Sequence, residues 1–346
     1  SYSFTVSQRL PWSSLLEVAY VGNQSNDLQN TSGAGSNVNL VPVGAMLGQV
    51  NPSTANANNF RPYLGYGDIN LATNNLYANY NAMQVTWARQ KGRFILQLNY
   101  SYQKALGIVN AALDPFDLSQ NYGIQPGDRR QLFNASYSFD MGNPFHGGNR
   151  IARGAVNGWQ LSGITSWESG SNLTYNSGTG DHYNIQLNSA IIPGSISAAN
   201  PKGIFIGNQS LLGTNAIQFN PTLTCNPTAN LAPHQYINGN CFAVPTQIGS
   251  NGPTLLPAAY GPAFFNSDLG LFKNFKIGES KKLQFRIQAY NFLNHPLWSF
   301  PNSNNLTLQF QQPVPGGPIT QTNSNFGTTT FKQGNRIVEL AVKFYF

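Results

Sequence analysis

The chain has 346 residues, of which 9% are charged and 12% are aromatic, and its formal net charge is +7. A composition with few charges and many aromatics excludes a typical disordered chain, and the lack of any run of about eighteen apolar residues excludes a transmembrane helix. The remaining way for such a chain to cross a membrane is a closed barrel of strands, in which every second residue can be polar.

Apolar and polar residues alternate with a period of two in many parts of the chain, which predicts strands. Nine are expected, at about residues 2–9, 15–23, 80–90, 93–105, 129–141, 157–175, 264–277, 281–296 and 336–346. In the last of them the apolar positions are Val338, Leu340, Val342, Phe344 and Phe346. The sequence therefore predicts an all-β fold with one apolar face and one face of amides, hydroxyls and occasional charges.

The connections between these strands alternate between short and long. Short ones contain Pro11–Ser14, Gln90–Arg93 and Gly278–Lys281, with a somewhat longer one at about 142–156. The long ones cover about 24–79, 106–128, 176–263 and 297–335. Short turns on one side and long loops on the other are typical of outer-membrane barrels. We therefore expect residues 1–346 to form part of one antiparallel transmembrane β-barrel. A soluble sandwich, which has small turns at both ends, is less consistent with this pattern.

Placing Phe346 at the periplasmic rim assigns a side to every connection. The short turns, with basic pairs such as Arg150 and Arg153, then lie on the periplasmic side near anionic phospholipid head groups. The long loop 176–263, with its cysteines and most of the uncharged stretch Gly203–Ser267, lies outside. The expected interface aromatics are Tyr100, Tyr102, Trp159, Trp167, Trp298, Phe344 and Phe346. Basic residues dispersed in this way argue against a nucleic-acid partner, which would require one basic patch interleaved with aromatics.

The polar face of the predicted sheet supplies a candidate lumen wall. It carries Gln97, Asn99, Gln103, Gln160, Ser162, Gln284, Arg286, Gln288 and Lys343. In a plugged barrel such a wall would hold the plug by hydrogen bonds and line the substrate path, and a merely solvated interior is the alternative. Cys225 and Cys241 lie close together in the uncharged stretch, and in an oxidising compartment they predict a disulfide that staples this loop.

The sequence contains no motif for catalysis or for a cofactor, so we expect neither. Its four histidines, on separate connections, are His146, His182, His234 and His295. Asp181–His182 resembles half of a triad but lacks the sequence context of a nucleophile. Asp114, Asp117 and Asp128 could coordinate calcium in an outer loop, but their spacing does not fit an EF-hand, and turn shaping is the favoured interpretation.

Four segments carry a resemblance to a known family. They are Leu16–Asn23 (LEVAYVGN), Asn79–Val85 (NYNAMQV), the stretch from Asp114 to Arg130 with its DPFD and DRR sequences, and Phe326-Gly327 together with the closing Arg336–Phe346. In these residues the chain resembles the C-terminal part of a TonB-dependent receptor. Within that family it is most similar to the Oar-like group, whose members have carboxypeptidase-regulatory-like N-terminal domains.

The resemblance implies a barrel of about 22 strands in the outer membrane of a Gram-negative bacterium. This chain would supply about nine of them at the C-terminal end, and the plug domain, the TonB-contacting segment and the early strands would lie outside it. The implied partners are outer-membrane lipid, the TonB system and the barrel-assembly machinery, which recognises the alternating strand that ends at Phe346.

Three functions are compatible with the sequence. The resemblance implies energised uptake of a bulky ligand, such as a glycan, a peptide-like compound or a chelate. A surface protein that binds or adheres without active transport is the second, and a soluble all-β binding module is the third.

Overall fold

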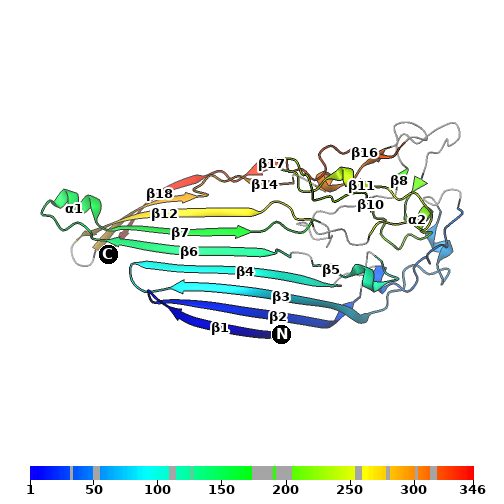
Figure 1. The fold of residues 1–346 in the computed structure, drawn as a ribbon, viewed down its shortest axis with the longest axis horizontal. Coiled ribbons are helices and arrows are strands. Elements are labelled where there is room, and N and C mark those ends of the chain that lie inside the picture. Colours follow the sequence, from blue (N-terminus) through cyan, green and yellow to red (C-terminus); the bar gives the residue numbers. More distant parts are fainter. Residues whose placement is uncertain are drawn as a thin grey trace.

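The computed structural model describes residues 1–31, 34–49, 55–108, 114–125, 128–173, 190–191, 205–253, 259–277, 281–300, 303–311 and 318–346. Their main element is an antiparallel sheet with the strand order β1-β2-β3-β4-β6-β7-β12-β13-β18. Figure 1 shows these strands lying side by side along the long axis of the molecule. No helix among the described residues is long and apolar enough to cross a membrane.

Each predicted strand corresponds to one long strand of the sheet. These are β1 (Tyr2–Leu10), β2 (Ser14–Asn30), β3 (Thr73–Arg89), β4 (Phe94–Ile108), β6 (Gln131–Gly142), β7 (Trp159–Glu168), β12 (Phe264–Ile277), β13 (Lys281–Tyr290) and β18 (Ile337–Tyr345). A two-residue strand, β5 (Gly123–Ile124), pairs with the end of β4.

Four strand boundaries differ from the prediction by six or seven residues, and the others by three or fewer. β2 continues to Asn30 and β3 begins at Thr73, because backbone pairing persists past a register shift near Leu28, where polar side chains no longer alternate with apolar ones. β7 ends early, at Glu168, because its partner β12 begins opposite that residue. β13 ends at Tyr290 because the next residue, Asn291, has a φ of 47° and turns the chain out of the sheet.

The ladder register gives the sheet two chemically different faces. Residues opposite each other in neighbouring antiparallel strands point to the same side. One row across seven strands is Val6, Val18, Val85, Tyr100, Phe133, Trp167 and Phe265. The adjacent row, on the opposite face, is Ser7, Glu17, Thr86, Asn99, Asn134, Ser166 and Asn266. The apolar face is open, since side chains such as Phe4 and Leu340 are 70% and 74% exposed.

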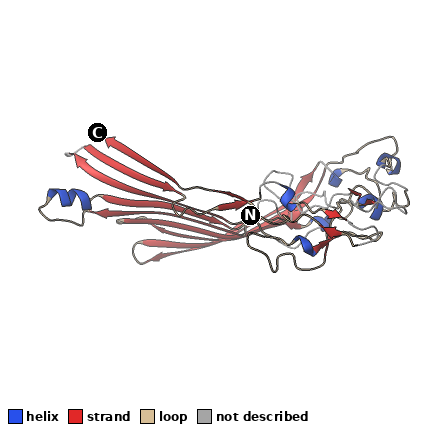
Figure 2. Ribbon diagram, turned by 90° about the horizontal axis from the view of Figure 1, so that it is seen from above, coloured by secondary structure: helices blue, strands red, loops and turns tan. Residues whose placement is uncertain are grey.

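The short and long connections lie at opposite ends of the sheet. The short ones and the C-terminal residue share one end, here named the turn end, and the long ones gather at the other, the loop end (Figure 1). The β6–β7 connection at the turn end contains α1 (Arg150–Val156), which the strand pattern did not predict. It begins where the side chain of Asn149 accepts hydrogen bonds from the backbone N–H groups of Ile151 and Ala152. Figure 2 shows α1 apart from the other helices, which lie at the loop end.

The long connections contain short elements of their own. They are η1 (Ala34–Ser36), η2 (Ala57–Phe60), η3 (Leu118–Asn121), β8 (Ala190–Ile191), β9 (Phe205–Ile206), α2 (Asn208–Leu211), β10 (Thr222–Leu223), η4 (Gly239–Cys241), β11 (Phe242–Ala243), β14 (Leu297–Ser299), η5 (Ser303–Leu306), β15 (Phe310–Gln311), β16 (Thr320–Gln321) and β17 (Phe331–Gln333). Small antiparallel pairs join β8 to β9, β10 to β11, β14 to β17 and β15 to β16.

A hydrophobic core lies in the loop end. Its buried side chains include Leu173, Leu211, Phe219, Ile237, Phe242, Phe300, Leu306 and Phe326. These residues belong to the β7–β12 and β13–β18 connections. The β2–β3 connection joins them through backbone hydrogen bonds, because the N–H groups of Gly44 and Met46 donate to the carbonyls of Leu212 and Gly213, both at 2.8 Å. We call the described parts of these three connections the loop cap.

Candidate functional site: the polar sheet face and the loop cap

The nine polar residues predicted for a lumen wall lie on one face of the sheet. The ladders connect Gln97, Asn99 and Gln103 of β4 to Gln160 and Ser162 of β7 through residues of β6 that share their side. The same ladders continue through β12 to the residues of β13 and β18, which are Gln284, Arg286, Gln288 and Lys343. The alternation in each separate strand and the register between strands therefore agree.

Hydrogen bonds between side chains link neighbouring strands across this face. On β13, the Gln284 amide donates to Asn274 Oδ1 at 2.7 Å, and the Arg286 guanidinium donates to Gln284 Oε1 at 2.6 Å and to the Tyr345 hydroxyl at 2.8 Å. On β7, the Gln160 amide donates to Ser138 Oγ at 2.9 Å. Because the bonds to Asn274, Tyr345 and Ser138 join different strands, the polar side chains form a connected surface.

The predicted list of wall residues left out several members of this surface, among them Thr86, Asn134, Ser138 and Asn274. Thr86 donates to Asn99 Oδ1 at 3.2 Å, and Asn134 Oδ1 accepts from the Ser166 hydroxyl at 2.8 Å. Each of them stands at a position of its strand whose side chain points to the polar face, between residues that point to the apolar face. Parity within each strand would have identified them without further information.

A hollow of about 370 Å³ interrupts the polar face over β6, β7, β12 and β13. Ser138, Ser162, Asp268 and Gln288 contribute polar groups to its lining, and Ile164 contributes an apolar side chain that is 58% exposed. The hollow includes Gly270, where a β-carbon would lie 2.8 Å from the ring of Phe272. The hollow thus combines hydrogen-bonding groups with a small apolar surface that includes Ile164.

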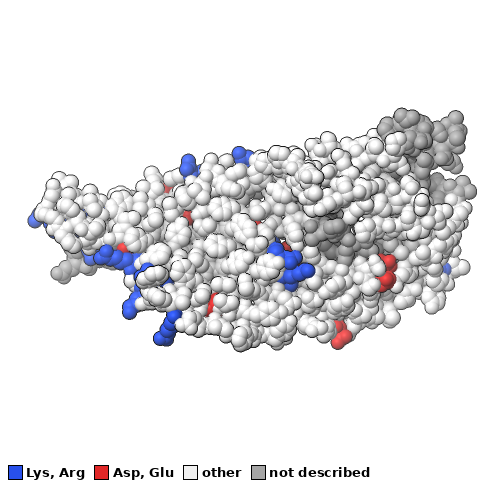
Figure 3. Space-filling view, in the orientation of Figure 1, with Lys and Arg blue, Asp and Glu red and all other residues white. Residues whose placement is uncertain are grey.

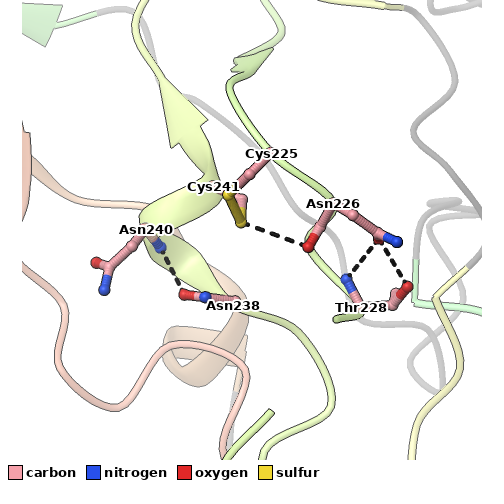
Figure 4. The surroundings of a disulfide bond; sticks show 6 residues. All are labelled: Cys225, Asn226, Thr228, Asn238, Asn240 and Cys241. Carbon is pink, nitrogen blue, oxygen red and sulfur yellow. Dashed lines mark hydrogen bonds between the residues drawn. A yellow bond between two sulfur atoms is a disulfide. The ribbon is translucent and has the colours of Figure 1, made fainter. Parts of the chain in front are cut away.

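The predicted cysteine pair is a disulfide in the loop cap. Cys225 and Cys241 are bonded, with their Cα atoms 4.8 Å apart, and 16 residues separate them in the sequence. Figure 4 shows the bond between a turn shaped by Asn226 and the short helix η4. Asn226 Oδ1 accepts from the Thr228 N–H and hydroxyl, and Asn238 Oδ1 accepts from the Asn240 N–H (Figure 4). The disulfide therefore connects two turns that are each held by an asparagine.

The predicted position of Trp298 at a sheet interface is wrong. Its strand, β14, pairs with β17 beyond the end of the main sheet, and its ring lies 4.1 Å from that of His234. The Lys332 ammonium lies over the Trp298 ring, 5.9 Å from its centroid. The error came from extending β13 to residue 296, whereas Asn291 ends that strand. Trp298 therefore belongs to the loop cap.

Two of the histidines pack against aromatic rings, and the outer-loop carboxylate of Asp114 accepts hydrogen bonds from the backbone. His234 packs on Trp298 and His295 on Phe265, while His182 and Asp181 lie outside the described residues. The Asp114 carboxylate accepts from the backbone N–H groups of Phe116 and Asp117. No cluster of three potential metal ligands occurs among the described side chains.

Asp117 and Asp128 differ in their electrostatics. Hydrogen bonds donated by Ser119 and then by Gln120 hold the pKa of Asp117 below its ordinary value. Burial raises the pKa of Asp128, whose carboxylate accepts from the Ala105 N–H at 2.8 Å. Asp117 thus caps η3, and Asp128 pairs with a backbone N–H near the end of β4. The two carboxylates have structural roles in separate turns.

Charge is unevenly distributed over the molecule. In Figure 3 most of the visible Lys and Arg side chains lie toward the turn end, and Asp and Glu side chains are visible toward the loop end. The stretch from Gly203 to Ser267 contains no Lys, Arg, Asp or Glu. The described part of the β7–β12 connection therefore presents amides, hydroxyls and aromatic rings, while the charges of the loop cap, among them the Arg61–Asp68 salt bridge and Lys332, belong to the other two connections.

The last strand ends the sheet at an edge. Val338, Leu340, Val342 and Phe344 point to the apolar face of β18, and each is at least half exposed. Phe346 is 95% exposed, and its ring stacks on Phe344 with the centroids 6.2 Å apart. Within the described residues β18 forms one edge of the main sheet and β1 the other.

Comparison with known families gives one result. A family model described as an outer membrane beta barrel domain matches residues 1–339, which begins before β1 and ends within β18. A comparison with curated proteins finds no match.

Proposed function

The chain belongs to the outer membrane beta barrel domain family, which places it in the outer membrane of a Gram-negative bacterium, and we propose that its sheet is the C-terminal wall of a TonB-dependent receptor. In this proposal the receptor takes up a bulky ligand through a barrel filled by a plug. The plug, the TonB-contacting segment and the remaining strands would belong to other parts of the same protein.

The separation of two faces across the whole sheet carries this proposal. An apolar row that begins at Val6 lies beside a polar row that begins at Ser7, and the order is kept over seven strands. Lipid can cover only the apolar face, since unpaired polar groups in hydrocarbon cost several kcal/mol each, roughly. The polar face is then left to line an interior that holds a plug and passes a ligand.

The two sheet edges support a larger barrel. In a membrane the backbone groups of β1 and β18 both require partners, because lipid supplies no hydrogen bonds. We propose that further strands, to a total of about 22, close the wall between them. The barrel-assembly machinery is the proposed partner that recognises β18 and the exposed Phe346.

The chemistry of the wall and of the loop cap favours a neutral polar ligand. Amide and hydroxyl groups dominate the polar face, and the β7–β12 part of the loop cap adds a stretch, Gly203–Ser267, without Lys, Arg, Asp or Glu. Such groups suit a glycan or a peptide-like compound better than a strongly charged chelate. The proposed role is binding and passage, with no enzymatic step and no cofactor.

A second function, surface binding without transport, is favoured by a different observation. The loop cap has its own hydrophobic core and a disulfide, so it could hold a fixed binding surface whether or not the barrel transports. In that case the polar face would be only a solvated interior. The two functions differ in whether the lumen contains a plug that can be opened.

Conductance of the full-length protein in a planar lipid bilayer distinguishes them. A plugged receptor should pass little current in buffer, open in large steps when urea unfolds the plug, and close again when urea is removed. This reversible opening is the expected result. Full-length protein without any urea-dependent conductance would exclude a plugged lumen and leave the surface-binding function.

A further inference from the structure

A pocket of about 720 Å³ lies at the turn end, beside α1. Its lining includes His146, Arg150 and Arg153 from the β6–β7 connection and Lys276 from β12. We propose that this turn pocket binds the phosphate of an anionic phospholipid in the periplasmic leaflet. The inference rests on the orientation in the proposed function, in which the turn end lies on the periplasmic side.

The charge of the turn pocket suits a phosphate. Its described lining residues include two guanidinium groups and one ammonium group, and none of them has a carboxylate. Asp140, the acidic residue that precedes the β6–β7 connection on β6, already accepts a hydrogen bond from the Gly142 N–H at 2.8 Å. Arginine is well suited to phosphate, because its planar fork of donors can bind two phosphate oxygens at once.

The connection that carries the two arginines is held in place by neutral side chains. Asn157 accepts from the Phe145 N–H at 2.9 Å and donates to the Phe145 carbonyl at 2.8 Å, which closes the connection on itself. Asn149 caps the first turn of α1. Arg150 and Arg153, three positions apart, therefore project from a fixed frame near one another.

Two side chains of the sheet place α1 at the lipid-facing side. The Trp159 indole donates to the Ala155 carbonyl at 2.7 Å, and the Lys273 ammonium donates to the same oxygen at 3.2 Å and also to the Asn157 carbonyl. Trp159 and Lys273 are opposite each other in the ladder and belong to the apolar face. The C-terminal turn of α1 is thus anchored on the face that lipid covers.

The phosphate could come from a lipid head group or from free phosphate, and apolar side chains beside the pocket favour the lipid. Ile151, between the two arginines in sequence, is 84% exposed, and Val156 at the other end of α1 is 46% exposed. Phe275, on the apolar face, lines the pocket directly. A short helix with exposed apolar and basic residues suits the interface between head groups and acyl chains.

Native mass spectrometry of the full-length protein in detergent tests the proposal. Phosphatidylglycerol is the probe, phosphatidylcholine is the neutral comparison, and inorganic phosphate is the competitor. The test variant is R150Q/R153Q. The matched control is K91Q/K343Q, which removes two positive charges at the same end of the sheet, from the β3–β4 turn and from β18, neither of which lines the pocket. Heat-modifiable gel mobility shows that each variant has folded as a barrel.

Wild type and the control should retain phosphatidylglycerol in preference to phosphatidylcholine, and R150Q/R153Q should lose about thirtyfold in retention. Equal retention by R150Q/R153Q and wild type would overturn the proposal. Displacement of the lipid by millimolar phosphate, with no preference for a lipid phosphate, would also overturn it, because the pocket would then bind the free anion. Neither outcome bears on the plug, so the two proposals fail separately.

Discussion

Asparagine side chains take the place of backbone partners in the connections. In four places one amide accepts from the N–H and donates to the C=O of a single residue: Asn39 with Tyr63, Asn121 with Asp114, Asn157 with Phe145 and Asn291 with His295. Buried backbone groups outside a ladder need such partners. An amide supplies a donor and an acceptor without adding charge. This chemistry lets long connections fold in a chain with very few ionic groups.

Replacing Asn39 by Leu should therefore destabilise the β2–β3 connection. Asn39 is completely buried, and the change removes the side chain that pairs with both the N–H and the carbonyl of Tyr63. The expected cost is about 1–3 kcal/mol for each buried group left unpaired. Hydrogen exchange of residues 37–70 measures it. Asn59→Leu, at an exposed position of η2, is the control and should leave exchange unchanged.

The stability of η3 should depend on pH through Asp117. Its pKa is lowered in the folded protein, so its contribution is fully present above the ordinary aspartate pKa of about 3.9 and is lost as the pH falls through the lower, folded value. Exchange protection of residues 114–125, corrected for the intrinsic rate, should drop in that acidic range. In D117N the drop should be absent, and a drop of the same size there would exclude Asp117 as its cause.

At the scale of strands, side-chain alternation predicted the positions of those strands whose two faces meet different media. Where one face meets an apolar medium and the other a polar one, parity is constrained, and β12 has the predicted bounds of 264 and 277. The end of β2 was missed because Gln24–Asn30 is polar at nearly every position and only backbone pairing defines it. The helix α1 was missed because its seven residues are too few to show a helical period.

A charge introduced at adjacent positions of β4 should give opposite results. Leu98 belongs to the apolar face and Asn99 to the polar face. An arginine that faces lipid near the middle of the bilayer costs about 2–4 kcal/mol, so L98R should lower the free energy of unfolding by that amount, while N99R should have little effect. Urea unfolding in lipid vesicles, followed by gel mobility, provides the measurement. Equal losses in both variants would contradict the assignment of the faces.

At the scale of the whole molecule, the loop cap could not be predicted from the sequence as a folded unit. Leu173, Phe242 and Phe326 meet in one core although they come from connections far apart in the chain. A scattered apolar residue in a long polar connection has no periodicity that identifies its partner. Only the pairing of the strands, which brings the ends of these connections to one side, determines which loops meet. The polar wall was predictable for the opposite reason, since it follows from local parity.

Phe326→Ala should weaken the loop cap and leave the sheet intact. The side chain is 2% exposed and packs edge-on against Phe242, with ring centroids 5.8 Å apart. Loss of a buried phenyl ring costs about 3–5 kcal/mol. Limited proteolysis should cut the variant within residues 205–253 faster than wild type, with unchanged heat-modifiable mobility. Phe116→Ala, at a position 47% exposed, is the control. If the variant lost its heat-modifiable mobility together with its resistance to proteolysis, the loop cap and the barrel would unfold together.

The shared core also limits how this surface can diversify. A receptor with independent loops can change its ligand by exchanging one of them, but here a foreign β13–β18 connection would remove Leu306 and Phe326 from beneath Ile237 and Phe242. Variation should therefore arise in two connections together, or at positions outside the core such as the exposed segment around Ile248. If the loop end faces outward, as proposed, that segment, instead of a whole loop, is for the same reason the natural place to insert a foreign epitope.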